Sequence, residues 1–269
     1  MAIPKIIHYI WFGENEKPEL AKKCIESWKK YCSDYEIKEW NEDNFDINCN
    51  EYVRQAYEAK KFAFVADYVR LYALYQEGGI YMDTDVEVIK PLDEFLENKA
   101  FAGFESQHAL LTGVIAAEKN NPWIQDLFSM YKDLKFIDEK GKMDLTTNVV
   151  RITELSEKEY GLSLESSHQI LKDGIVRIYP YDYFCAKDYD TDKVCITENT
   201  HTVHHFSASW HGEKEKKQAE RYRKRLKKYI DKYGEEKGKI KLNQHDLIVF
   251  YLKHPFKAIK RIIEKIKGE

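Results

Sequence analysis

Hydrophobic positions in the first half of the chain switch repeatedly between the spacing of a strand and that of a helix. Strand-like runs cover residues 3–12, 35–40, 80–89, 101–104 and 111–117. Helical spacing covers residues 20–31, 51–76 with a break near 60–61, and 122–134. Strands that alternate with helices predict an α/β domain with a largely parallel central sheet.

The second half of the chain is less regular and ends in a charged region. Helical character is found around residues 149–155, short strands at 176–179 and 203–206, and a charged helix at 213–233. Residues 213–269 carry 19 Lys and Arg side chains and nine Asp and Glu, whereas residues 1–212 carry 24 and 37. We therefore predict a catalytic domain over 1–212 and a basic helical extension over 213–269. The acidic domain excludes nucleic acid as a partner.

Composition places the chain among globular proteins. Its 269 residues with 43% hydrophobic side chains are enough for a core without disulfide bonds. The five cysteines form no CxxC pair, and no secretory signal precedes the first strand. These features predict reduced thiols and a cytoplasmic protein.

The segment 78–88, GGIYMDTDVEV, carries the most informative polar residues. In an extended strand, residues two apart point to the same side, so Asp83 and Asp85 are expected to project together, opposite their apolar neighbours. Two adjacent carboxylates repel each other unless a cation lies between them. Their oxygen atoms select Mg²⁺ or Mn²⁺, which also bind diphosphate oxygens. The pattern therefore predicts a metal site that assists the departure of a nucleoside diphosphate.

Three other interpretations of this Asp-x-Asp pair compete with a metal site. The first is a solvated edge of acidic side chains, the ordinary reading of an isolated pair. A haloacid-dehalogenase-type phosphatase requires Thr or Val two residues after the second aspartate, where this chain has Glu87. A calcium-binding EF-hand loop requires glycine at its sixth position, where this chain has Val88. The last two interpretations fail on residue identity.

Three stretches of the chain together resemble glycosyltransferase family 32. Residues 64–85, FVADYVRLYALYQEGGIYMDTD, resemble the sugar-binding Asp-x-Asp region of that family. Residues 4–13, PKIIHYIWFG, resemble its first strand, and residues 202–210, TVHHFSASW, its later His-x-x-x-x-Ser-Trp pattern. The family includes capsular-polysaccharide transferases and Golgi mannosyltransferases, so the resemblance implies capsular or other cell-surface polysaccharide synthesis.

The resemblance implies a GT-A fold, which is Rossmann-like with a single mixed, mostly parallel sheet flanked by helices. It also implies a retaining hexosyltransferase that depends on Mn²⁺ or Mg²⁺. Asp83 and Asp85 are then the metal ligands, and His204 supplies the third ligand, with His205 as the alternative. The alternative for His204 is a histidine whose hydrogen bonds are satisfied within the core.

The resemblance assigns further residues to the nucleotide-sugar donor. Asp67 and Arg70 lie three apart on one helical face and are expected to reach the donor sugar and phosphate, with a structural ion pair as the alternative. With the two aspartates of the motif they form the predicted catalytic group. Trp11 matches the residue that stacks on the nucleobase. The remaining expected donor contacts are His8, Tyr81, Asp83 and Trp210.

The substrates are less sharply defined than the site. The resemblance to the family favours a UDP-hexose or UDP-N-acetylhexosamine as the donor over GDP-mannose. It favours a saccharide acceptor, and lipid-linked saccharides are included. The Thr-Gly-Pro stretch that the family often shows on the acceptor side is replaced by Thr146, Thr147 and Asn148, so no acceptor contact is carried over there. Two other functions stay open: a hydrolase of sugar phosphates or nucleotide sugars, and a non-catalytic scaffold that binds a nucleotide sugar.

The end of the chain has an amphipathic pattern. An apolar stripe of Ile259, Ile262, Ile263 and Ile266 is interleaved with lysine and arginine. Such a helix suits peripheral contact of residues 241–269 with the inner face of the plasma membrane. Packing against the protein's own body is the equal alternative.

Overall fold

A computed structural model describes residues 2–106, 109–207 and 213–253 of the chain. The chain divides into two compact units. One comprises Met1–Asp188 and Lys193–Trp210, and the other Tyr189–Asp192 and His211–Glu269. The first unit contains every described strand, and with them the Asp-x-Asp segment.

The first unit is built around a seven-stranded sheet with the order β2-β1-β3-β6-β5-β8-β7. Its strands are β1 (Ile6–Ile10), β2 (Glu36–Trp40), β3 (Gly79–Met82), β5 (Ala100–Ser106), β6 (Ala109–Ala117), β7 (Gln169–Leu171) and β8 (Val176–Tyr179). β1 is parallel to β2 and β3, and β5 is parallel to β8, whereas β6 is antiparallel to both neighbours and β7 to β8. The predicted α/β fold with a mixed sheet is confirmed. Parallel pairings are not the majority, because the β5–β6 and β7–β8 connections are too short for a parallel crossover.

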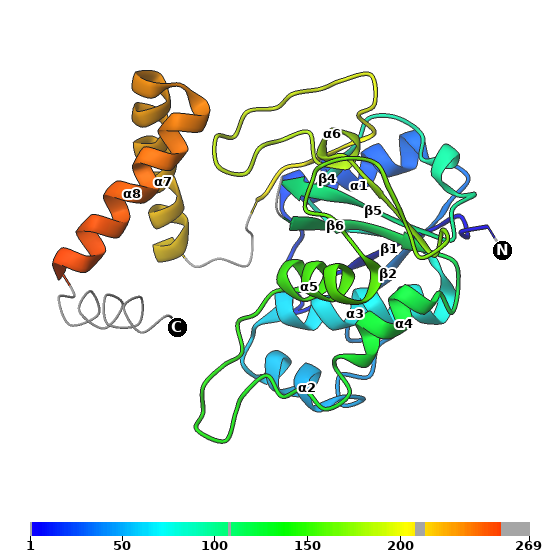
Figure 1. The fold of residues 1–269 in the computed structure, drawn as a ribbon. Helices are drawn as coiled ribbons and strands as arrows, with labels where there is room; N and C mark the ends of the chain where they lie inside the picture. Colours follow the sequence, from blue (N-terminus) through cyan, green and yellow to red (C-terminus); the bar gives the residue numbers. More distant parts are fainter. Residues whose placement is uncertain (1, 107–108, 208–212, 254–269) are drawn as a thin grey trace. The chain divides into compact units, whose positions relative to one another are not determined.

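Helices cover both faces of this sheet (Figure 1). They are α1 (Glu19–Tyr31), α2 (Glu51–Glu58), α3 (Phe62–Glu77), α4 (Pro122–Ser129), α5 (Asn148–Tyr160) and the short α6 (Tyr181–Phe184). Two hydrophobic clusters, one on each face, form the core. Strand β3 contributes to both, since Ile80 and Met82 pack with α1 and Tyr81 packs with α3, as the alternation of a strand requires.

The chain changes direction sharply where α3 meets β3. The predicted break near residues 60–61 separates α2 from α3, and Gly78 and Gly79 end α3 with φ angles of 73° and 108°. A Cβ on Gly78 would lie 2.7 Å from the backbone nitrogen of Lys119. Both the positive φ and this close approach require glycine.

A second, two-stranded sheet lies beside the first. Its strands are β4 (Val86–Val88) and β9 (Thr202–His204), which pair antiparallel. Helix α1 holds β4 in place: the Trp28 indole nitrogen donates to the Val86 carbonyl at 2.7 Å, and the Val88 amide donates to Ser27 Oγ at 2.9 Å. These contacts fix the segment that directly follows Asp85.

The second unit is helical. Helix α7 (Glu213–Tyr233) confirms the predicted charged helix, and α8 (Glu235–Lys253) follows it. The two helices pack through the buried Leu226 and Leu242. Within the described residues no helix has the length and apolar character that a bilayer crossing requires. The predicted amphipathic stripe of residues 259–266 lies outside the described residues.

Candidate active site

The Asp-x-Asp motif lies in a turn and not within one continuous strand. Strand β3 ends at Met82, and β4 begins at Val86. The Val86 amide donates to the Asp83 carbonyl at 3.0 Å, which closes the turn. The predicted strand over residues 80–89 is therefore wrong at its centre, because β4 leaves the main sheet to pair with β9.

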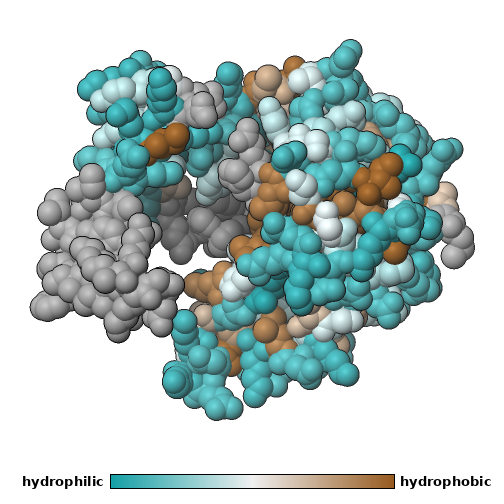
Figure 2. All heavy atoms as spheres, viewed as in Figure 1, coloured by the Kyte–Doolittle hydropathy of each residue, from teal (hydrophilic) through white to brown (hydrophobic). Residues whose placement is uncertain are grey.

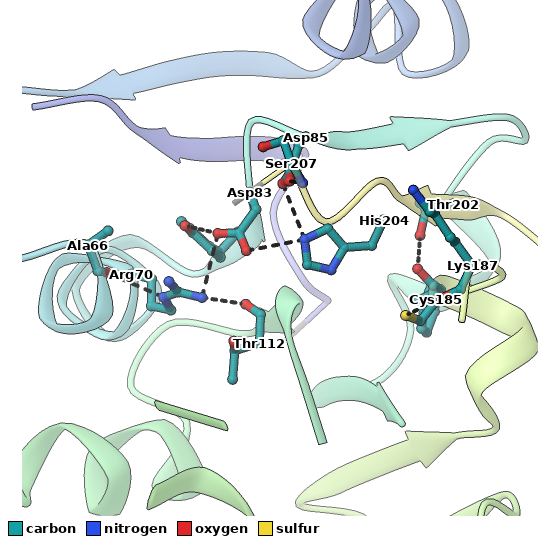
Figure 3. Close-up of polar contacts among 12 residues, drawn as sticks. Ala66, Arg70, Asp83, Asp85, Thr112, Cys185, Lys187, Thr202, His204 and Ser207 are labelled. Carbon is teal, nitrogen blue, oxygen red and sulfur yellow. Dashed lines mark hydrogen bonds and ion pairs between the residues drawn. The ribbon is translucent and has the colours of Figure 1, made fainter. Parts of the chain in front are cut away.

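Pairing of β4 with β9 brings His204 to the motif. Its Nε2 atom lies 3.2 Å from Asp85 Oδ1 and 3.9 Å from Asp83 Oδ2. One ligand atom from each of the three residues lies within 4.8 Å of the others. Figure 3 shows the three side chains directed toward one another. Two carboxylates and one imidazole are a ligand set that suits a divalent cation, as the sequence predicted.

The structure decides between the two neighbouring histidines. His205 Nε2 lies 2.9 Å from Glu87 Oε2, so its ring pairs with a different carboxylate. Its backbone amide donates to the Asp85 carbonyl at 2.9 Å. His204, only 8% exposed, is the histidine that faces both aspartates of the motif.

A buried ion-pair network extends the triad toward α3. Arg70 lies 2.9 Å from Asp67 Oδ1 and 3.6 Å from Asp83 Oδ1, and it donates to the Thr112 carbonyl at 2.6 Å. The Tyr81 hydroxyl donates to Asp83 Oδ1 at 2.5 Å, and the guanidinium lies 4.5 Å from the Tyr81 ring. Asp67, Arg70, Tyr81 and Asp83 thus form one connected group, and the predicted pairing of Asp67 with Arg70 is present.

Burial and neighbouring charges shift the pKa values of the acidic side chains in this group. Burial raises the pKa of Asp67 to about 6, against the attraction of Arg70. Burial acts in the same direction on Asp85, but hydrogen bonds from His204 and from the Ser207 amide hold its pKa well below the ordinary value. Asp85 is therefore ionised at neutral pH and carries a negative charge beside His204.

Asn148, at the start of α5, is a site residue that the sequence did not reveal. Its amide donates to Asp67 Oδ2 at 3.1 Å, and its side-chain nitrogen donates to the Asp67 carbonyl at 2.7 Å. Its side-chain oxygen Oδ1 accepts from the Tyr131 hydroxyl at 2.6 Å. Asp67 and Asn148 are 81 residues apart in the sequence, so their contact leaves no signal in a single sequence. In the sequence, Asn148 stands out only as part of a departure from the family pattern.

Two further residues beside the triad were missed. Gly113 on β6 lies so close that an added Cβ would be 3.1 Å from Asp83 Oδ2 and 3.2 Å from the His204 ring. A glycine in a strand often marks such a close approach, and this was the available signal. Glu105, near the end of β5, has its pKa raised by burial, and the charges of His204 and Asp83 also act on it.

The remaining residues assigned to the donor make other contacts. His8 is fully buried, with Nε2 2.7 Å from the Gly78 carbonyl and Nδ1 accepting from the Trp40 indole at 3.1 Å. Both ring nitrogens are thus used in holding β1 against its neighbours, and a direct donor contact by His8 is not what this geometry provides. Trp11 is partly exposed just after β1 and donates to the Asn15 carbonyl at 2.6 Å. Trp210 lies outside the described residues.

Metal binding at this triad should depend on pH through His204. Burial acts to lower the pKa of His204, but its hydrogen bond to Asp85 and the charges of both aspartates raise it well above the ordinary value. A metal at Nε2 must displace the proton held there, so affinity falls as the pH falls. We expect the Mn²⁺ dissociation constant to change about tenfold per pH unit below that pKa.

Calorimetry between pH 6 and pH 8, in buffers of different ionisation enthalpy, measures this proton release. His204→Gln should remove the pH dependence of Mn²⁺ affinity. The matched control, His205→Gln, should keep it. A Mn²⁺ affinity that is constant over this range in the unmodified protein would contradict the assignment of His204.

Both aspartates of the triad lie within a recognised sequence region. Residues 18–102 match the family model described as a glycosyltransferase sugar-binding region containing the DXD motif. This part of the chain includes Asp67, Arg70, Asp83 and Asp85. The resemblance of residues 64–85 to a glycosyltransferase sugar-binding region is confirmed.

Two mannosyltransferases are similar to part of this chain. Inositol phosphoceramide mannosyltransferase 3 of Schizosaccharomyces pombe is 31% identical over 131 residues, which cover 46% of this chain and 35% of that protein. Inositol phosphoceramide mannosyltransferase 1 of the same organism is 29% identical over 110 residues, covering 37% and 33%. The chain therefore matches about a third of the length of these relatives.

Solved glycosyltransferase structures are similar at lower identity. The PaToxG glycosyltransferase has a TM-score of 0.45 and 22% identity, over 59% of this chain and 69% of that one. A glycosyltransferase involved in the glycosylation of the major capsid of PBCV-1 has a TM-score of 0.42 and 15% identity, over 81% and 98%. The galactosyltransferase LgtC has a TM-score of 0.40 and 17% identity, over 81% and 94%.

Proposed function

We propose that this protein is a metal-dependent, retaining glycosyltransferase that moves a sugar from a nucleotide-sugar donor to a saccharide acceptor. The observation that supports this most directly is the convergence of His204, within 4.8 Å, on Asp83 and Asp85 of the sugar-binding region. The three residues would hold Mn²⁺ or Mg²⁺. When bound, such a cation neutralises charge that develops on a departing diphosphate.

The protein's own residues prepare the rest of the site. Arg70 donates to the Ala66 and Thr112 carbonyls and pairs with Asp67 and Asp83, so its positive charge is held beside the motif. The Tyr81 hydroxyl donates to the same Asp83 oxygen, Oδ1, that lies near Arg70. Because these groups are already hydrogen-bonded to one another, little reorganisation is needed when a donor binds.

We infer that transfer retains the anomeric configuration. The acceptor hydroxyl attacks on the face from which the nucleotide leaves. The bond from the sugar C1 to the phosphate oxygen breaks, the bond from C1 to the acceptor oxygen forms, and the acceptor proton passes to the leaving phosphate. NMR of the product anomer tests this, and an inverted product would refute it.

A thermal-shift panel tests the choice of donor. Ligands that bind only the folded state raise the melting temperature, so the donor should stabilise the protein in the presence of Mn²⁺ and much less without it. The panel contains UDP-glucose, UDP-galactose, both UDP-N-acetylhexosamines and GDP-mannose. We expect a UDP-sugar to give the largest shift, although the names of two relatives make GDP-mannose the main competitor.

Product analysis then separates transfer from hydrolysis. A transferase forms a glycoside only when an acceptor is present, whereas a nucleotide-sugar hydrolase releases free sugar at the same rate without one. A binding scaffold would show the thermal shift and neither product. Rapid acceptor-independent release, or binding without any product, would contradict the proposed function.

A further inference from the structure

Helix α5 begins at a residue that is polar and yet buried. Asn148 is the first residue of this helix and has no exposed surface, whereas Thr147 before it is partly exposed. Hydrophilic side chains cover most of the face shown in Figure 2, where water can satisfy their hydrogen bonds. A buried asparagine must find its partners within the protein, so the partners of Asn148 indicate its role.

Asn148 is fixed by hydrogen bonds on both sides of its amide group. Its side-chain nitrogen donates to the Asp67 carbonyl at 2.7 Å, and Oδ1 accepts from the hydroxyl of the buried Tyr131 at 2.6 Å. Its backbone amide donates to Asp67 Oδ2 at 3.1 Å. These contacts join the start of α5 to α3 and direct the first amide of α5 at the Asp67 carboxylate.

Asp67 takes the place of a capping side chain for α5. The first amides of a helix have no partner within the helix, and a side chain at the N-cap usually accepts from one of them. Thr147 is the N-cap residue of α5, but its side chain makes no such hydrogen bond. Asp67 supplies the missing oxygen from another helix. The positive end of the α5 dipole therefore stabilises the negative charge of Asp67, against the effect of burial.

The two oxygen atoms of the Asp67 carboxylate have different partners. Oδ2 accepts from Asn148, and Oδ1 lies 2.9 Å from Arg70 Nη2. Arg70 Nη1 in turn lies 3.6 Å from Asp83 Oδ1. Because one oxygen is held by α5, the carboxylate meets Arg70 in a restricted orientation. A continuous series of contacts thus leads from α5 through Asp67 and Arg70 to the metal motif.

Asn148 has no exposed atom with which to contact a substrate, so any role in transfer must act through Asp67. The residue also stands where the chain departs from the Thr-Gly-Pro stretch of the resembled family. A proline at this position would have no N–H group to donate. The hydrogen bond to Asp67 Oδ2 therefore depends on the residue that this chain has here.

We propose that Asn148 is a positioning residue for sugar transfer: it fixes the Asp67 carboxylate, and through Asp67 it holds the Arg70 guanidinium beside the metal motif. The inference rests on the proposed function, in which the positive charge of Arg70 helps to balance charge that develops on the departing diphosphate. Without Asn148, the carboxylate is free to turn and the guanidinium is less firmly held. The metal ligands themselves stay in place.

Asn148→Pro tests this proposal because it removes the N–H group and the side chain while it suits the first position of a helix. Thr147 already has the extended conformation, φ −78° and ψ 162°, that a residue before proline adopts. We expect kcat to fall at least about tenfold, with a smaller change in the KM of the donor and no change in Mn²⁺ affinity. Asn148→Ala keeps the N–H group and should lose less activity than Asn148→Pro.

A double-mutant cycle with Asp67→Asn shows whether Asn148 acts through Asp67. In the Asp67→Asn protein, Asn148→Pro should lower kcat by no more than about threefold, because the charge that Asn148 orients is already lost. The matched control is Asn121→Ala, which alters an equally buried asparagine at the N-cap of α4. Asn121 donates to the Lys99 and Ile175 carbonyls, so its loss should change kcat by less than about twofold.

Urea denaturation of the same variants gives a readout that needs no activity. The shift in the urea midpoint caused by Asn148→Pro should shrink by about half or more in the Asp67→Asn protein. A normal kcat in Asn148→Pro, an equal loss in Asn121→Ala, or an undiminished loss in the Asp67→Asn protein would overturn the proposal. If the unmodified protein transferred no sugar, the proposed function would fail, and the urea cycle would still decide whether Asn148 fixes Asp67.

Discussion

Replacing Asp85 by asparagine is expected to lower sugar transfer by about a thousandfold, equivalent to about 4 kcal/mol of transition-state stabilisation. Asp85 offers one oxygen at 3.2 Å from His204 Nε2, and its other oxygen accepts from the Ser207 amide at 2.7 Å. Asparagine keeps a carbonyl oxygen for Ser207 but removes the negative charge that a cation needs. The loss should therefore appear both in kcat/KM and in Mn²⁺ affinity.

Glu87→Gln is the matched control for this variant. Glu87 lies two residues further on and pairs with His205 away from the triad, so its neutralisation should change kcat/KM by less than about threefold. Steady-state rates for both variants at saturating Mn²⁺ give the comparison. An Asp85→Asn protein that kept a tenth or more of the normal rate would show that Asp85 is no metal ligand.

The second large effect is on stability. Arg70→Met should lower the free energy of unfolding by about 3–5 kcal/mol, because it leaves Asp67 buried without its countercharge. Asp67 is only 7% exposed and Arg70 5%, so water cannot replace the lost partner. Urea denaturation followed by circular dichroism measures the change.

Two further variants separate the charge effect from simple loss of a side chain. Arg54→Met removes an exposed i,i+4 pair with Glu58 on α2 and should cost no more than about 0.5 kcal/mol. Asp67→Asn/Arg70→Met removes both buried charges and should recover part of the stability lost in Arg70→Met. If Arg70→Met and Arg54→Met destabilised the protein equally, the buried network would not carry the energy assigned to it.

The spacing of hydrophobic residues along the chain predicts most of the helices and strands that the sequence identifies correctly. The first three strands and the helices around them have clear spacing, and Gly78 and Gly79 mark the end of α3. Strand β7 and helix α6 were missed because each is only three or four residues long. Helix α4 ends at Ser129, earlier than the pattern that runs to residue 134, since apolar residues beyond it serve the following loop and core.

The sequence predicts the site residues that lie close together along the chain. It does not predict those that only strand pairing or tertiary packing brings to the site. Asp67, Arg70, Asp83 and Asp85 lie within 19 residues and carry the family pattern. The choice of His204 over His205 needed the register of β9 on β4, in which Val86 pairs with His204. Asn148 and Gly113 reach the site only through tertiary packing, so their positions follow from the fold and not from any motif.

Isothermal titration of the preferred nucleotide sugar into the protein, with Mn²⁺ and with EDTA, tests the role of the triad most directly. Donor affinity should be at least about tenfold higher with Mn²⁺, and Asp85→Asn should abolish that difference. Equal affinity in Mn²⁺ and EDTA, with Asp83, Asp85 and His204 all intact, would contradict a metal-assisted glycosyl transfer at this site.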